Sequence, residues 1–288
     1  MGVNIKRNYR HNAALRGSFN ALAEKTFGLN FENWYKLGFW GDNYEPFSIV
    51  LEGNVVANVS LNRTDLLIGG RRRRVYQLGT VMTEESCRNR GYIRAIMQEI
   101  EKATRDADGV YLFANDSVLD FYPRFGFVPG KEYVYSKAVS QTGENRMRQV
   151  VMDCDAHIDA LCGAMEGNTF ESACQMVDNN DLIFFYAAQF MRECVFYWEE
   201  KDLWTIAELE EGQLMLHAVF CPNTIDLDAV IGAFGGEVTS VTLGFAPKDA
   251  AGWDCWELQE EDCTFFVKGD LFREFAERKL RIPTLSHA

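Results

Sequence analysis

The stretch Cys87-Arg88-Asn89-Arg90-Gly91-Tyr92-Ile93-Arg94-Ala95-Ile96-Met97 places three arginines within seven residues around a single glycine. It contains no carboxylate, although the chain as a whole carries a net charge of −13. An alternating run over residues 75–82 precedes it and predicts a strand. After the glycine, apolar residues recur at helical spacing over residues 93–103. The sequence therefore predicts a strand, a glycine-containing loop and a helix in succession.

A loop of this kind can hold an anion. Backbone N–H groups in the first turn of a helix have no partner within the helix, and the helix dipole adds partial positive charge. Arg88 and Arg90 add full charges with a planar geometry that suits phosphate. Gly91 allows the backbone to approach a ligand closely. These residues alone leave two interpretations equally open, a phosphate site or a basic helix start on the surface.

Composition narrows the class of protein. The 288 residues are 47% hydrophobic and 25% charged, and no apolar run approaches the roughly 18 residues that a membrane span needs. The N-terminus has no apolar secretory core. The eight cysteines show no CxxC spacing and the four histidines are scattered, which argues against a zinc site or disulfides. We expect a cytoplasmic protein with free thiols, no metal and no membrane partner.

The two halves of the chain differ in charge. Residues 1–144 carry 19 Lys and Arg against 16 Asp and Glu, whereas residues 145–288 carry 10 against 26, a net −16. Residues 138–149 are polar and lack apolar periodicity. We therefore predict two domains, residues 1–140 and 150–288, joined by a linker over residues 141–149.

Periodicity and turn residues predict mixed α/β structure in both halves. In the first half we expect helices over residues 13–27, from 92 and over 116–124, and strands over 47–51, 55–62, 75–82, 110–114 and within 127–136. In the second we expect helices over 155–165, 227–234 and 271–279, and strands over 204–209, 213–220, 238–245, 256–258 and 263–267. The second half repeats the order of the first without its arginine loop.

Three motifs in order resemble those of the GNAT superfamily of N-acetyltransferases. Arg88-x-x-Gly91-x-Ile93 resembles its Arg/Gln-x-x-Gly-x-Gly/Ala pyrophosphate loop, and residues 78–82 are similar to its central strand. Asn115 followed by residues 121–127 (FYPRFGF) resembles its Asn…Phe-Tyr-x-x-x-Gly-Phe signature. The resemblance covers roughly residues 10–137.

Ile93 departs from the pattern, because the superfamily usually has Gly or Ala there. A larger residue is similar to the enhanced-intracellular-survival type of acetyltransferase, which joins two such domains in tandem. Its additional sterol-carrier-like domain has no room in 288 residues. The resemblance implies an α/β fold with mixed sheets, in which an acetyl-CoA-binding GNAT domain precedes a degenerate, acidic GNAT-like domain that does not bind CoA.

The resemblance also implies residues that bind acetyl-CoA, mainly through their backbones. The pyrophosphate would be held by Asn89, Arg90, Gly91, Tyr92 and Ile93, with Arg88 assisting, and the pantetheine arm and acetyl carbonyl by Val81, Met82 and Asn115. The reaction is direct attack of a neutral primary amine on the thioester. Such an amine is only about one part in a thousand neutral at pH 7, so a proton must be removed.

Tyr122 matches the tyrosine with which this family often protonates the leaving thiolate; its alternative role is ordinary aromatic packing. For the base, Glu84 lies just past the central strand, although a solvated loop carboxylate is an equally good interpretation. Ala288 is a second candidate, because two-domain relatives use the terminal carboxylate of the chain.

Trp34, Trp40, Asp42 and Tyr44 occupy the place where relatives build the acceptor pocket, and packing in the core is an equal alternative. Aromatic rings and carboxylates favour a cationic acceptor, such as a polyamine, an aminoglycoside-like amine or a basic peptide. Arg71-Arg72-Arg73-Arg74 is better interpreted as a solvated hairpin tip than as a nucleic-acid site. The rival function is a non-catalytic acetyl-CoA-binding or partner-binding module. The oligomeric state is open, with a dimer as one alternative.

Overall fold

The computed structural model describes residues 4–140 and 143–287. Its helices are α1 (Ala13–Phe27), α2 (Glu32–Lys36), α3 (Tyr92–Ala103), α4 (Asp155–Glu166), α5 (Asn180–Phe185), α6 (Leu227–Gly232) and α7 (Arg273–Arg278). Among the described residues, no helix combines the length and the apolar character needed to cross a membrane.

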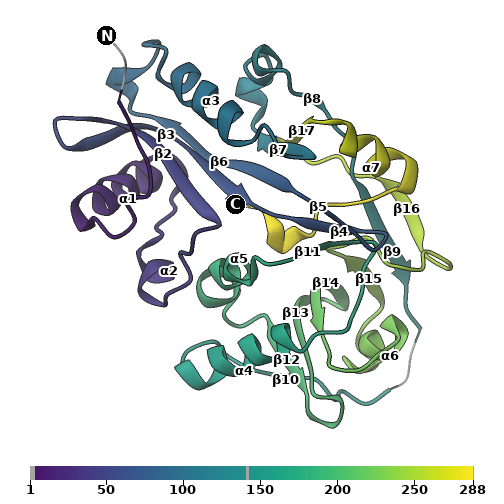
Figure 1. The fold of residues 1–288 in the computed structure, drawn as a ribbon. Coiled ribbons are helices and arrows are strands. Elements are labelled where there is room, and N and C mark those ends of the chain that lie inside the picture. Colours follow the sequence, from purple (N-terminus) through teal and green to yellow (C-terminus); the bar gives the residue numbers. More distant parts are fainter. Residues whose placement is uncertain (1–3, 141–142, 288) are drawn as a thin grey trace.

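The strands form two large mixed sheets and one small one (Figure 1). The strands of the N-terminal half are β1 (Ile5–Lys6), β2 (Tyr44–Leu51), β3 (Asn54–Arg63), β4 (Leu66–Ile68), β5 (Arg71–Arg73), β6 (Val75–Thr83), β7 (Gly109–Ala114), β8 (Val128–Pro129) and β9 (Tyr133–Ala138). Those of the C-terminal half are β10 (Arg148–Gln149), β11 (Cys174–Met176), β12 (Val195–Trp198), β13 (Leu203–Glu210), β14 (Gln213–Phe220), β15 (Ser240–Leu243), β16 (Asp254–Glu257) and β17 (Thr264–Lys268).

Local sequence explains the two helices that flank the first sheet. The side chain of Asn12 accepts a hydrogen bond from the N–H of Leu15 and so caps α1, and Gly28 ends the helix with a left-handed φ of 71°. Helix α3 buries one apolar stripe and leaves its polar face in solvent. Figure 1 shows α1 and α3 on opposite faces of the sheet. Both predicted helices are confirmed.

The two large sheets exchange strands. The first has the order β1-β2-β3-β6-β7-β17-β8, so β17, from the end of the chain, lies between β7 and β8. The second has the order β10-β12-β13-β14-β15-β9-β16, so β9, from the first half, lies between β15 and β16. Strands were expected within residues 127–136, but β8 and β9 belong to different sheets. The predicted linker over residues 141–149 thus separates two halves of the chain, and each half contributes a strand to the sheet of the other.

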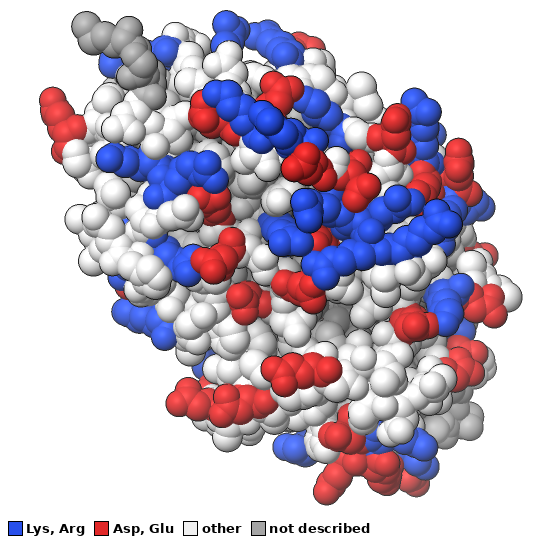
Figure 2. Space-filling view, in the orientation of Figure 1, with Lys and Arg blue, Asp and Glu red and all other residues white. Residues whose placement is uncertain are grey.

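A third sheet, β11-β4-β5, also joins the halves, because β11 pairs with β4. Its β4–β5 hairpin carries the four-arginine run, and Lys and Arg gather over it in Figure 2. The tip is not simply solvated. Arg72 binds Asp65 at 2.7 Å and also pairs with Asp178, and Arg73 binds Glu274 at 2.7 Å. Two of the four arginines thus attach the hairpin to the C-terminal half.

Asp65 is the buried centre of this attachment, with only 1% of its surface exposed. Burial alone would raise the pKa of this carboxyl. Hydrogen bonds from Arg63 and Arg72 outweigh that effect and hold the pKa below its usual value. The carboxylate consequently stays ionised at neutral pH and keeps both guanidinium partners.

Gly269, directly after β17, gives a test of the strand exchange. Its φ is 119°, and a Cβ at this position would lie 2.5 Å from the carbonyl oxygen of Asp108, which precedes β7. Since the contact is with rigid backbone, Gly269→Ala should reduce the free energy of unfolding by about 2–5 kcal/mol. Chemical denaturation followed by fluorescence measures this loss.

Gly252→Ala is the matched control. Gly252 also has a positive φ, 77°, but no atom lies within 4 Å of the Cβ that alanine would add. We expect this variant to lose only about 1 kcal/mol. Equal losses in the two variants would contradict the close docking of β17 against the start of β7.

Candidate active site

The first sheet opens in its middle. Strands β6 and β7 are parallel but pair only over three residues each, Val75–Gln77 with Gly109–Tyr111. Opposite β3, the two residues Thr80 and Val81 face a single residue, so β6 contains a bulge. A bulge bends its strand, and beyond it β6 and β7 diverge. Their facing backbone groups are then available to a ligand.

Buried hydroxyl and amide groups support this bulge. Thr80 has an unusual φ of 41°. Its hydroxyl donates to Ser60 at 2.6 Å and lies 2.9 Å from the hydroxyl of Tyr44, and its carbonyl accepts from the Asn58 side chain at 3.0 Å. A strained residue of this kind persists where the surroundings over-determine it. Tyr44, expected in an acceptor pocket, instead braces the bulge.

A cavity of about 1180 Å³ occupies the opening between the strands. All the predicted CoA-binding residues line this cavity: Val81, Met82, Arg88, Asn89, Arg90, Gly91, Tyr92, Ile93 and Asn115. Tyr122 also lines it, together with residues of the C-terminal half, Phe185, Tyr186, Phe190 and His287. One hollow therefore joins the arginine loop, the bulge and the tyrosine.

The arginine loop forms the positive end of the cavity. Asn89 and Gly91 both have left-handed φ values, 61° and 78°, and no side chain caps the start of α3. The first N–H groups of α3 thus remain without intrahelical partners. Arg88, Arg90, Arg94 and Arg124 line the same region, and none of the four is ion-paired to another described residue. This end is built to hold an anion of several charges.

The corresponding place in the second sheet differs. There α6 follows β14, and Asp226 caps the helix by accepting a hydrogen bond from the N–H of Asp228. A carboxylate already occupies the helix start, and a second lies in its first turn. This arrangement disfavours an anion at the start of α6, and the absence of CoA binding by the C-terminal half stays a prediction.

Tyr122 lies on a short 3-10 helix beside α3, with 5% of its surface exposed. Its ring packs against Phe121 and Phe127. Burial raises the pKa of its hydroxyl to about 12, so the group stays protonated at neutral pH. No residue in the described ranges hydrogen bonds this hydroxyl. It therefore remains available as a donor in the cavity wall.

Asn115 is held by the other half of the chain. Its side-chain amide donates to the carboxylate of Asp262 at 2.9 Å, and the same carboxylate accepts from the N–H of Asp116 at 2.6 Å. These hydrogen bonds lower the pKa of Asp262. The amide nitrogen is thus occupied, and the side-chain oxygen is the atom that Asn115 can offer to a ligand.

Of the two predicted bases, Glu84 lies outside the cavity wall. Its carboxylate instead binds the ammonium of Lys25 at 2.6 Å, with a further bond from the N–H of Glu85. The bond from Lys25 chiefly lowers the pKa of Glu84, which makes it a weaker base. Ala288 lies outside the described residues.

The segment before it, however, enters the site. The carbonyl of Ser286 accepts a hydrogen bond from Tyr111 at 2.9 Å, and that of His287 accepts one from Tyr186 at 2.6 Å. The His287 ring stacks on Phe113 with 4.0 Å between ring centroids. Burial lowers the pKa of His287 to about 3, so the ring is neutral. Only the apolar character of residues 282–288 hinted at this docking.

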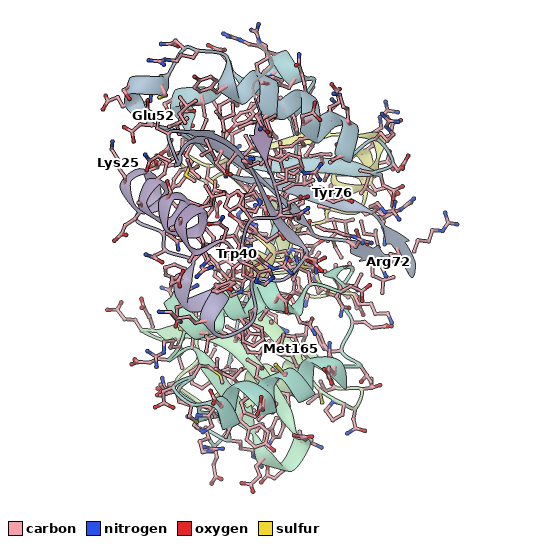
Figure 3. All side chains as sticks on the ribbon, turned by 60° about the vertical axis from the view of Figure 1, so that its left-hand side comes forward. Lys25, Trp40, Glu52, Arg72, Tyr76 and Met165 are labelled. Carbon is pink, nitrogen blue, oxygen red and sulfur yellow. The ribbon has the colours of Figure 1, made fainter. Side chains whose placement is uncertain are left out.

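The remaining predicted acceptor residues are absent from the cavity wall. Trp34 and Trp40 are 2% and 3% exposed and pack with Phe19, Phe31 and Tyr44 in one aromatic cluster. Figure 3 shows Trp40 in the interior, whereas Lys25 lies near the edge. Asp42 is exposed and binds Arg10 at 2.6 Å. The two tryptophans are therefore core residues, which was the alternative to an acceptor pocket. Their rings fill the space between α1, α2 and α5.

One group elsewhere has side chains that can bind metals. Asp153, Cys154 and His157 meet at the start of α4, with candidate ligand atoms within 4.8 Å of one another. Nδ1 of His157 lies 2.7 Å from the carbonyl of Val151. The group is largely exposed and does not line the cavity. The expectation of a protein without metal stays a prediction.

Comparisons with known proteins agree with this geometry. Residues 18–130 match the family model described as an acetyltransferase (GNAT) domain. No curated protein sequence matches the chain.

Among solved structures, a probable N-acyltransferase from Enterococcus faecalis V583 matches with a TM-score of 0.62 and 14% identity, over 92% of this chain and 71% of that one. A GCN5-related N-acetyltransferase from Kribbella flavida gives 0.55 and 16%, over 92% and 70%. Eis1 from Mycobacterium abscessus gives 0.52 and 13%, over 91% and 73%.

The structural likeness covers both halves, and it confirms the predicted fold class, a mixed α/β GNAT fold followed by a second, GNAT-like unit. The family match lies on the half that holds the arginine loop, the bulge and Tyr122. Residues 18–130 therefore match the acetyltransferase (GNAT) domain family, within a fold that extends over both halves.

Proposed function

We propose that the protein transfers an acetyl group from acetyl-CoA to a primary amine by direct attack. One observation carries this proposal. A single cavity joins the arginine loop, whose arginines form no ion pair with a described residue, to a bulged strand and a protonated tyrosine. The family match supports the reaction class. The cytoplasmic location expected from the free thiols stays a prediction.

The shape and charge of the cavity suit a CoA thioester. Its phosphates would bind the N–H groups at the start of α3 together with Arg88, Arg90 and Arg124. The pantetheine arm would lie between β6 and β7, where the two strands no longer pair. Amide groups in that arm would bond the free backbone groups around Val81, as an added strand does in a sheet.

The chemistry then proceeds beside the bulge. The nitrogen of the neutral amine attacks the thioester carbonyl carbon, forming the C–N bond, and the C–S bond breaks as the tetrahedral intermediate collapses. Tyr122 gives its hydroxyl proton to the leaving thiolate. The proton lost by the amide nitrogen returns through solvent to the tyrosinate, so the products are the amide and the CoA thiol.

The acceptor would arrive as an ammonium ion, because an alkyl amine has a pKa near 10. The −16 charge of residues 145–288 supports its attraction to the protein. The other candidate function, an acetyl-CoA-binding module without turnover, predicts binding with no amine-dependent release of CoA. Thiol release in the presence of amines separates the two.

Gly91→Glu should abolish most acetyl-CoA binding. The change places a carboxylate at the start of α3, where the phosphates would bind. It also forces a side chain onto a residue with a φ of 78°. Loss of charge-assisted hydrogen bonds to phosphate should weaken binding about 10- to 100-fold. Isothermal titration calorimetry of acetyl-CoA into each protein measures the effect.

Gly53→Glu is the control for this change. Gly53 has a φ of 82°, and a Cβ there would contact nothing within 4 Å, as at Gly91, but it lies in the β2–β3 turn outside the cavity. We expect Gly53→Glu to bind acetyl-CoA with the same affinity as the wild type. If wild type fails to bind acetyl-CoA, the proposed function is wrong.

Tyr122→Phe should lower kcat by about 10²- to 10⁴-fold, because the leaving thiolate loses its proton donor. Its affinity for acetyl-CoA should stay unchanged, since the ring and its packing remain. Tyr197→Phe, which removes a hydroxyl bonded to Asp202 outside the cavity, is the control. Equal kcat values for wild type and Tyr122→Phe would refute the assignment.

The pH dependence follows from the raised pKa of Tyr122. A donor acts only while protonated, so its contribution is lost as the pH rises through its pKa of about 12. Below that value the wild-type rate should rise with pH as more of the amine becomes neutral, without a falling limb below about pH 10. A falling limb centred between about pH 8 and 10 would contradict this role.

A further inference from the structure

The part of the cavity on the α1 face of the first sheet has an apolar wall. We define the acceptor lobe as the cavity-lining residues Phe27, Leu29, Phe185, Tyr186, Phe190 and His287. Phe27 is the last residue of α1, and Phe185 packs in the same aromatic cluster as the buried face of α1. The arginine loop begins α3, which covers the opposite face. The cavity thus has a cationic end and an apolar end.

The described part of the lobe offers no carboxylate to a cation. None of the described residues that line the cavity is Asp, Glu or Lys, and the charged ones are all arginines: Arg88, Arg90, Arg94 and Arg124. His287 is neutral, and the hydroxyl of Tyr186 is already bonded to the His287 carbonyl. Among the described residues, a permanently charged group buried in the lobe would have no carboxylate as counter-ion, which is unfavourable.

The mouth of the lobe exposes apolar surface to solvent. Phe27 is 42% exposed and Phe190 is 56% exposed. Phe190 packs edge-to-face on Phe185 with 5.4 Å between ring centroids, and Phe185 in turn stacks on Phe31 at 5.1 Å. Aromatic side chains that are anchored on one side and exposed beside a cavity are typical of a binding surface for an apolar group.

We propose that the acceptor is a primary amine carried on an apolar body, with no second charged group. The body would occupy the lobe and place its nitrogen at the bulge. An apolar surrounding disfavours the ammonium form and lowers the pKa of the bound amine. The proton therefore leaves to solvent as the amine enters, which supplies the neutral nucleophile without a carboxylate from the described wall. Diamines, polyamines and aminoglycosides keep a further charge and should be poorer acceptors, in contrast to the cationic acceptor expected from the sequence.

This inference rests on the proposed function, and its test compares two acceptors of equal length. Acetyl transfer from acetyl-CoA is measured with n-hexylamine and with 1,6-diaminohexane, which differ by one terminal ammonium. We expect kcat/KM for hexylamine to be higher by about 100-fold or more. Along the series from n-butylamine to n-heptylamine, kcat/KM should rise roughly two- to fourfold with each CH₂ buried.

Phe190→Glu should reduce or reverse the preference for hexylamine over 1,6-diaminohexane, because it gives the lobe a carboxylate. Phe190 is exposed, so the change does not disturb the core. Trp256→Glu is the matched control, because Trp256 is 49% exposed on β16 and does not line the cavity. The control variant should keep the wild-type ratio of the two acceptors.

Several outcomes would overturn the inference while leaving the proposed function intact. These are an equal or greater kcat/KM for the diamine and an unchanged acceptor ratio in Phe190→Glu. A flat alkylamine series with faster transfer from octanoyl-CoA than from acetyl-CoA would assign the lobe to the acyl chain and also overturn it. Failure of the proposed function is distinct, because acetyl-CoA would then either not bind or bind without transfer to any amine.

Discussion

The short pairing between β6 and β7 is the constraint on which the site depends. Three residues of each strand pair, and the bulge at Thr80 and Val81 then turns β6 away from its neighbour. The sheet loses hydrogen bonds there, and a network of buried side chains through Tyr44, Ser60 and Asn58 fixes the bulge in place. The opening lies directly before the arginine loop, so a ligand held by that loop has an extended path into the sheet.

The C-terminal half is more than a support for this opening. Its β17 completes the first sheet beside β7, and Asp262, just before β17, fixes the side chain of Asn115. Phe185 and Phe190 supply one wall of the cavity, and the segment through His287 supplies another. A half that has no arginine loop of its own therefore shapes the end of the cavity where the acceptor would bind.

Local patterns in the sequence were enough to predict α1, α3, β3, β6 and the arginine loop, because capping residues, periodicity and turns act within a few residues. The aromatic segment was ambiguous, since Trp34 and Trp40 fit a pocket or a core equally well, and only packing against Phe185 decides between them. The exchange of β9 and β17 was not predictable. Both strands carry apolar residues that suit either sheet, and the choice depends on pairing partners far away in the chain.

The exchange has a consequence for how the chain is made. Ala114 of β7 pairs with Thr264 of β17, so the first sheet is incomplete until the chain has been synthesised beyond residue 264. During translation the N-terminal half presents β7 as an open edge, the kind of surface that recruits foreign strands. Folding must wait for contacts of high sequence separation, which slows it. The shared sheets predict that the two halves fold as one cooperative unit and that neither half is stable when expressed alone.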